Sequence, residues 1–318
     1  MSKYIKDHSL TVGFNPISEQ KFFKLLKRYE KYIHSYFFSL THGLVGNKYN
    51  PKDILAILGK CDTYNIPGNI LFNTYESEEK WEKQIELVKD IINLQGVTVL
   101  TPEIGRVIKE KYPDLEIHLS VRFWDWHEEK STHELFEENI DIFKEVISII
   151  NISGFRSYND HELRNKIKDL GIQTKFIANE GCITRKNYNY NNFPEVKDLE
   201  CLSQYKNCDR ICEKIVFKKI PWLELCRVNF YKEQLQFYDY DIIKLSTRNQ
   251  YTDAAAIYLD YWTSDEKSSF IPYMVNRSIK INDNNYETYL NWLESRSFCS
   301  NDCFHCRKCE RFYNELIK

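Results

Sequence analysis

Short runs of apolar, β-branched and aromatic residues alternate along the chain with longer stretches whose apolar residues recur at helical spacing. The short runs have the length and composition of buried β-strands. We expect strands at residues 10–14, 35–40, 69–73, 97–100, 116–123, 150–153, 173–178 and 241–246. A helical stretch follows most of these runs, so that the chain repeats a strand–helix unit of about thirty residues.

Individual residues mark the ends of several expected helices. Ser18 can cap a helix over residues 18–32, and Pro51 and Pro102 stand where proline is favoured, in a first helical turn. Gly171 is suited to ending the helix before it, because glycine adopts the left-handed conformation that helix ends often need. The pattern therefore predicts helices as well as strands in fixed alternation.

Repeated strand–helix units are typical of a parallel sheet with right-handed crossovers. Seven or eight units favour a closed (β/α)8 TIM-barrel-like fold over an open doubly wound sheet. No glycine-rich phosphate-binding motif follows an early strand, which argues against a dinucleotide-binding fold. In such a barrel the chemistry lies at the C-terminal ends of the strands. The candidates for catalysis there are Glu180, Arg122, Arg156 and Arg248.

Two segments depart from the repeat. Residues 179–222 lack a clear periodic element, and a segment of this length indicates an insertion carrying cysteines. Residues 286–318 look helical, then cysteine-rich, then helical again. We therefore expect a barrel over residues 1–285, including the cysteine loop, and a C-terminal cysteine-rich tail over residues 286–318.

Composition and charge exclude little. The 318 residues carry a formal net charge of −2 and are 42% hydrophobic, enough for a sizeable core without a global attraction to nucleic acid. No apolar run resembles a signal peptide or a membrane span. We expect a cytoplasmic protein whose cysteines are reduced and free to bind metal.

Seven of the ten cysteines fall in two groups. The C-terminal group has the spacing C-x3-C-x2-C-x2-C, and the mid-chain group is more widely spaced. Clustered thiolates repel one another unless a cation neutralises them, so both groups indicate metal. A [4Fe-4S] cluster is favoured, with zinc as the alternative for the C-terminal group; buried, inert thiols are the structural alternative for both groups. The proposed ligands are Cys182, Cys208, Cys212, Cys299, Cys303, Cys306 and Cys309.

The order of motifs from residue 10 to residue 262 resembles the peptidase U32 family. The resemblance rests on TPEIGRVIKEKYPDLEIHLSVRF, on IINISGFRSYNDHELRNKIKDLGIQTKFIANEGC, and on IIKLSTRNQYTDAAAIYLDYW after a cysteine-bearing loop. The best local correspondences are Glu180–Gly181–Cys182 and the stretch from Lys244 to Arg248.

The resemblance implies a barrel-like iron–sulfur enzyme. Relatives include oxygen-independent hydroxylases of the ubiquinone pathway and enzymes that hydroxylate RNA. Cys182, Cys208 and Cys212 match three cluster ligands of the family by their order. The fourth ligand has no counterpart at the end of the second strand, where His42 stands instead, and the C-terminal cysteine run is not part of the family pattern.

Each candidate side chain also has a structural interpretation. The three arginines suit a bidentate clamp on a carboxylate or phosphate, but strand-end salt bridges would use them equally well. Glu180 could act as an acid or base, or support the cluster. His118 is more simply an interior histidine than a catalytic base, and the aromatic residues 123–127 suit either stacking on a substrate or packing under a loop.

Together these features predict a U32-like iron–sulfur enzyme that hydroxylates, or otherwise modifies by redox chemistry, a small-molecule, peptide or RNA substrate without oxygen. A partner subunit is compatible with this function. The alternatives are a zinc-binding interaction module, allowed by the basic and aromatic tail sequence HCRKCERFY, and a peptidase-type hydrolase, for which the chain offers no HExxH or G-x-S-x-G motif.

Overall fold

The computed structural model describes residues 5–14, 19–40, 51–72, 77–127, 129–152, 160–178, 231–237, 239–245, 252–265, 270–273, 277–296 and 306–317. Its contacts divide the chain into two units. The barrel unit consists of Ile5–Ile177 and Tyr240–Leu259, and the second unit of Met1–Tyr4, Ala178–Asp239 and Asp260–Lys318.

Eight parallel strands close the barrel unit in sequence order, with β8 hydrogen-bonded to β1. All eight strands and the closed (β/α)8 fold expected from the sequence are confirmed. The strands are β1 (Leu10–Gly13), β2 (Ile33–Phe38), β3 (Gly68–Phe72), β4 (Leu94–Val99), β5 (Glu116–Leu119), β6 (Ile149–Ile152), β7 (Gln173–Ile177) and β8 (Ile242–Leu245).

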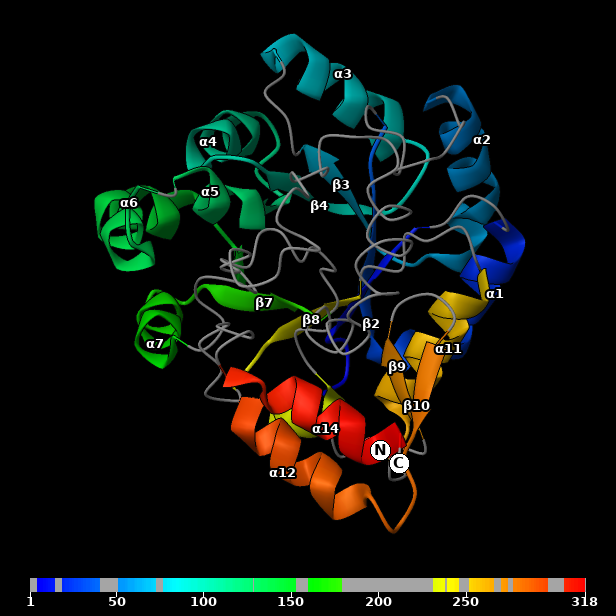
Figure 1. Cartoon of the computed structure of the whole chain (residues 1–318). Coiled ribbons are helices and arrows are strands. Elements are labelled where there is room, and N and C mark those ends of the chain that lie inside the picture. Colours follow the sequence, from blue (N-terminus) through cyan, green and yellow to red (C-terminus); the bar gives the residue numbers. More distant parts are fainter. Residues whose placement is uncertain are drawn as a thin grey trace, which may run out of the picture. The chain divides into compact units, whose positions relative to one another are not determined.

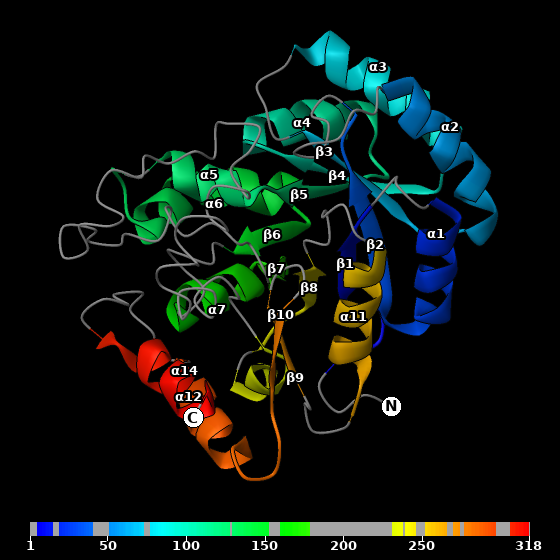
Figure 2. The same ribbon diagram turned by 45° about the vertical axis from the view of Figure 1, so that its right-hand side comes forward.

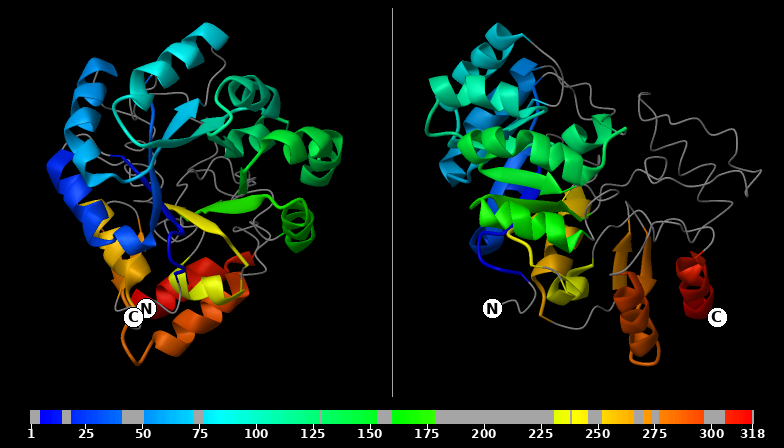
Figure 3. Two further views of the ribbon diagram at one scale, coloured as in Figure 1. Left: turned by 180° about the vertical axis from the view of Figure 1, so that it is seen from behind. Right: turned by 90° about the vertical axis from the view of Figure 1, so that its left-hand side faces the viewer.

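Helices surround this ring of strands, as Figure 1 and the view from behind in Figure 3 show. They are α1 (Glu19–Arg28), α2 (Pro51–Cys61), α3 (Glu78–Lys89), α4 (Pro102–Lys111), α6 (Thr132–Val146) and α7 (His161–Asp169), with short 3-10 turns η2 (Glu30–Tyr32) and η3 (Asp62–Tyr64). Helix α11 (Thr252–Thr263) follows β8 and runs from the barrel unit into the second unit.

The helix boundaries follow from local side-chain chemistry. Helices α2 and α4 begin at Pro51 and Pro102, as expected. Ser131 and Glu134 form a reciprocal capping box at the start of α6. Gly171, at φ +75°, comes just after α7, so the expected glycine at this helix end is confirmed.

Aromatic rings fill the layer between the first strands and α1. Phe14 packs edge-on against Phe22 with ring centroids 5.5 Å apart, and Phe23 packs edge-on against Tyr36 at 5.2 Å. Tyr36 therefore points outward from β2 toward the helix layer. Because neighbouring residues of a strand face opposite sides, Ser35 and Phe37 point into the barrel.

The strand expected over residues 116–123 is shorter than its sequence pattern suggested. β5 ends at Leu119, and a short helix, α5 (Val121–Trp126), follows at once. The Ser120 hydroxyl accepts a hydrogen bond from the Arg122 N–H at 3.3 Å and so caps this helix. Trp124 is fully buried and donates from Nε1 to the carbonyl oxygen of Asn151 at 2.9 Å. The aromatic residues at this turn thus pack against β6.

The second unit contains η7 (Lys232–Phe237), the hairpin strands β9 (Phe270–Tyr273) and β10 (Arg277–Lys280), α12 (Tyr286–Arg296) and α14 (Lys308–Ile317). The antiparallel hairpin, seen in Figure 2, was not predicted from the sequence. The helical flanks of the cysteine-rich tail were predicted, and α12 and α14 confirm them.

A buried carboxylate joins three segments of this second unit. Glu233 accepts hydrogen bonds from the hydroxyls of Tyr261, at 3.1 Å, and Tyr289, at 2.8 Å. Burial and the neighbouring Glu233 raise the pKa of both tyrosines, so both keep their protons and donate. The Trp292 and Phe312 rings stack 4.2 Å apart and hold α14 against α12.

Within the described ranges, no helix combines the length and apolar character needed to cross a bilayer.

Candidate functional site

The interior of the barrel is polar. TIM-barrel interiors are usually filled by branched apolar side chains, which pack without requiring hydrogen-bond partners. Here each of the eight strands carries one inward-facing polar side chain that is at most 7% exposed. They are Thr11, Ser35, Asn69, Thr98, His118, Asn151, Lys175 and Lys244. Burying a polar group costs free energy unless the group forms hydrogen bonds, so this set of side chains indicates a buried hydrogen-bond network.

His118, on β5, is the centre of that network. Its Nε2 lies 3.1 Å from a carboxylate oxygen of Glu116, which can only accept a hydrogen bond. Nε2 therefore carries the hydrogen, and Nδ1 is the acceptor. Nδ1 accepts hydrogen bonds from the amide Nδ2 of Asn69 at 3.0 Å and from the amine Nζ of Lys175 at 3.1 Å. The expectation that His118 is an interior histidine is confirmed.

Hydrogen bonds also fix the neighbours of His118. Thr98 donates its hydroxyl to the Asn69 side-chain oxygen at 2.7 Å, which turns the Asn69 amide nitrogen toward His118. Burial, followed by the charges of Lys175 and Lys244, lowers the pKa of His118 well below its ordinary value. The imidazole is therefore neutral at physiological pH.

Lys175 extends from β7 into the same network. Burial lowers the pKa of its amine from the ordinary 10.5 to about 7, and the nearby Glu116 carboxylate opposes the effect only in part. A lysine in this state is an effective base or nucleophile near neutral pH, unlike a surface lysine. Glu116 is about one-third exposed and connects the buried pair to solvent at the N-terminal end of β5.

A second buried lysine, Lys244, lies on β8, the strand next to β7. Its amine sits over the Phe37 ring, 4.2 Å from the centroid, which provides a cation–π contact. Both buried amines act electrostatically on His118. The barrel interior thus holds two lysine amines and the Asn69 amide around one neutral imidazole.

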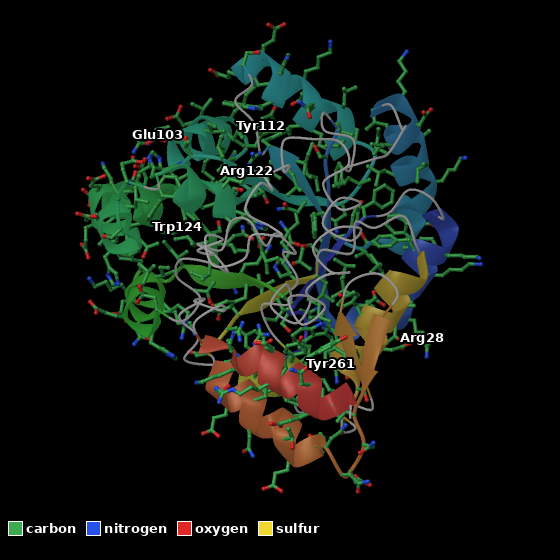
Figure 4. All side chains as sticks on the ribbon, viewed as in Figure 1. Arg28, Glu103, Tyr112, Arg122, Trp124 and Tyr261 are labelled. Carbon is green, nitrogen blue, oxygen red and sulfur yellow. The ribbon has the colours of Figure 1, made fainter. Side chains whose placement is uncertain are left out.

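The structure describes one of the four residues proposed for catalysis. Arg122 lies on α5, labelled in Figure 4 beside Trp124, rather than on a strand as expected. The side chain is half-buried, and α5 follows directly from the C-terminal end of β5. Glu180, Arg156 and Arg248 lie outside the described residues, so the arginine clamp stays a prediction.

Of the seven proposed metal ligands, the structure describes Cys306 and Cys309. Cys306 is half-buried and Cys309 is buried. The residue after Cys306, Arg307, has φ 52° and turns the chain into α14. The described residues contain no group of three or more side chains able to bind a metal. Cys182, Cys208, Cys212, Cys299 and Cys303 lie outside them.

The sequence contains a signal for Lys175 and Lys244, but strand periodicity alone did not identify them as part of a site. In QTKFI and IIKL a lysine interrupts an otherwise buried strand. A lysine is almost never fully buried without a partner, so each was a candidate for an interior charge. Whether it points inward depends on the register between strands, which only the closed sheet supplies.

No family model and no curated protein matches this chain. Among solved structures, two variants of the tryptophan synthase alpha-subunit from the hyperthermophile Pyrococcus furiosus align with 81% of this chain and 98% of theirs. They are 8% and 9% identical, with TM-scores of 0.46 and 0.44. An uncharacterized B. cereus protein is 12% identical over 54% of this chain and 47% of its own, with a TM-score of 0.34. The assignment of a closed barrel rests on the strand pairing itself.

Replacing Phe312 by Ala is expected to destabilise the tail of the second unit by about 3 kcal/mol, because it removes a buried ring stacked on Trp292. Near-ultraviolet circular dichroism during urea unfolding measures the change. Asn314→Ala, at an exposed position of the same helix, is the control and should change stability by under about 0.5 kcal/mol. An equal effect of both variants would contradict the packing of α14 on α12.

Proposed function

We propose that this chain is a barrel enzyme of the U32 kind that carries an iron–sulfur centre. Its reaction is the oxygen-independent hydroxylation, or a related redox modification, of a small-molecule, peptide or RNA substrate. The observation that supports this most is the point at which the cysteine segment leaves the barrel. β7 ends at Ile177, and Cys182 follows five residues later.

The C-terminal ends of barrel strands are where (β/α)8 enzymes place their chemistry. The five residues from Ile177 to Cys182 can span at most about 18 Å. Arg122 follows β5 at the same end of the barrel. A cluster held by the mid-chain cysteines would therefore be close to the mouth of the barrel.

The donor set fits the proposed centre. Thiolates are the ligands of iron–sulfur clusters and of structural zinc. In the C-terminal group, Arg307 lies between Cys306 and Cys309 and has a left-handed backbone at φ 52°. An iron–sulfur cluster, when bound, supplies one-electron redox chemistry. The protein's part is to bind and orient the substrate. Arg122, at the C-terminal end of β5, would be one cation that does so.

Purification without oxygen tests the proposal. We expect a brown protein with about four or eight irons per chain, depending on whether one or both cysteine groups hold a cluster. Replacing Cys182, Cys208 and Cys212 together by Ser should remove the colour or halve the iron. Cys61→Ser, in helix α2 and outside both groups, is the matched control and should leave the iron content unchanged.

Zinc in place of iron would contradict the redox function. A colourless protein with zinc bound only by the C-terminal group would instead favour the interaction module. Removing residues 299–318 separates the two: loss of partner or RNA binding without iron chemistry identifies a module, whereas loss of colour identifies the enzyme. The substrate class follows from comparing RNA digests, peptides and metabolites of cells with and without the protein, for the gain of one oxygen atom.

A further inference from the structure

Three side chains inside the barrel form a continuous line of hydrogen bonds. Glu116 accepts from His118 Nε2 at 3.1 Å, and His118 Nδ1 accepts from Lys175 Nζ at 3.1 Å. The line runs from a half-buried carboxylate to a fully buried amine. The same order of groups, a carboxylate, an imidazole and a nucleophile, activates the nucleophile in hydrolases.

The direction of each hydrogen bond suits activation of the amine. His118 Nδ1 has only a lone pair, so Lys175 donates an N–H to it and retains its own lone pair. Asn69 donates to the same Nδ1 and keeps the ring in place when the amine moves. Glu116 is positioned to stabilise the positive charge that arises whenever the imidazole takes up a proton.

The other ionisable groups around Lys175 are His34, Lys244 and Glu116, and the Glu116 carboxylate raises the pKa of the amine against the larger effect of burial. His34, on β2, lies with its ring 6.4 Å from that of His118, and burial and the Lys175 charge lower the pKa of His34. Lys244, on β8, adds a second amine close to the network. Glu116 supplies a carboxylate among these facing groups, and it is bonded to His118.

We propose that Lys175 is a nucleophilic amine that forms a Schiff base with the carbonyl group of a small aldehyde or ketone, with His118 relaying its protons and Glu116 stabilising the protonated imidazole. This role is separate from the iron–sulfur centre and needs no metal. Lysines desolvated inside a protein or next to a second cation are the ones that carry out this reaction.

The reaction balances without a further reagent. Nζ attacks the carbonyl carbon, a C–N bond forms, and the C–O bond breaks. The two Nζ protons leave with the carbonyl oxygen as water, each passing through His118 Nδ1. The products are an imine on Lys175 and one water molecule, and hydrolysis returns the free amine.

Reductive trapping on the full-length protein tests this role. The protein is incubated with glycolaldehyde and sodium cyanoborohydride at pH 7, and the modified lysines are identified by peptide mass spectrometry. An ordinary lysine is neutral in only about one in 2,500 molecules at pH 7, so Lys175 should be labelled at least about tenfold faster than exposed lysines. Lys130, exposed and paired with Glu138, serves as the internal reference.

Variants and pH separate a reactive amine from a merely buried one. His118→Gln should slow the labelling of Lys175 by about tenfold, the size of a typical general-base contribution at its lower range. Labelling of Lys175 should reach half its maximum near pH 7, whereas that of Lys130 continues to rise above pH 9. Lys175→Met must lose the labelled peptide while retaining the circular dichroism of the folded barrel.

The outcome that overturns the proposal is equally definite. If exposed lysines are labelled while Lys175 stays unmodified in folded protein, the amine is structural. If His118→Gln and wild type label at the same rate, the relay is wrong. Iron content plays no part in either result, so failure here and failure of the iron–sulfur proposal can be told apart.

Discussion

Lys175→Met is expected to stabilise the barrel at pH 7 by about 3 kcal/mol and to flatten the dependence of its stability on pH. In the unfolded chain the Lys175 amine has its ordinary pKa of 10.5, and in the folded barrel burial lowers the pKa to about 7. As the pH falls from 10.5 to 7, the unfolded state takes up a proton that the folded state does not. Stability therefore decreases over this window and changes no further below it.

Methionine removes this linkage. At pH 7, where the folded amine is still about half protonated, the difference between the two pKa values corresponds to about 4 kcal/mol, from which the lost hydrogen bond to His118 subtracts about 1 kcal/mol. Asn69 still donates to His118, so no buried acceptor is left alone. Urea unfolding, monitored by far-ultraviolet circular dichroism at a series of pH values from about 6 to about 10, measures the change in stability.

Lys130→Met is the matched control for this experiment. Lys130 is exposed, and its hydrogen bond with Glu138 raises the pKa of its amine. Its replacement should change stability by under about 0.5 kcal/mol. If Lys175→Met destabilised the barrel at pH 7 and kept the wild-type pH profile, the buried amine would be charged and paired, contrary to our interpretation.

Gly96→Ala is expected to destabilise the barrel by about 3 kcal/mol and to disturb the network around His118. Gly96 lies on β4, and a Cβ built there would stand 2.7 Å from the backbone oxygen of Glu116 and 3.1 Å from Nδ2 of Asn69. The first neighbour is backbone in the adjacent strand and cannot move aside alone. The second is the amide that orients His118.

Gly59→Ala is the control, because Gly59 is exposed on helix α2 and its added Cβ would meet a side-chain methyl group, Ile91 Cγ2, at 3.3 Å. Alanine favours a helix by about 1 kcal/mol over glycine, so this variant should be neutral or slightly stabilising. Thermal unfolding of both variants gives the comparison. A Gly96→Ala variant as stable as wild type would show that β4 and β5 can separate at this point.

Much of the barrel could be predicted from the sequence, because each strand carries its own apolar run and turn. The alternation at residues 173–178 and 241–246 was enough to place β7 and β8. The end of β5 was misplaced, since the apolar pattern continues through Val121 and Phe123, and only the Ser120 cap marks the change to a helix. The hairpin of β9 and β10 was missed because proline and asparagine interrupt its short runs.

The polar interior could not be predicted in the same way. Asn69, His118 and Lys175 come from β3, β5 and β7, and nothing local to any one of them shows that the three meet. Their contact depends on the stagger between neighbouring strands, which is a property of the closed sheet. The cysteine groups show the opposite case: their spacing is a local signal, and the metal they indicate stays a prediction.

Barrel closure has a consequence for synthesis of the chain at the ribosome. The last strand, β8, bonds to both β1 and β7, but residues 178–239 emerge before it. Until then, the nascent sheet of seven strands has two unpaired edges whose backbone amides and carbonyls can recruit another polypeptide. Translation pauses within that interval would lengthen this vulnerable period, so chaperone demand should peak before Ile242 leaves the exit tunnel.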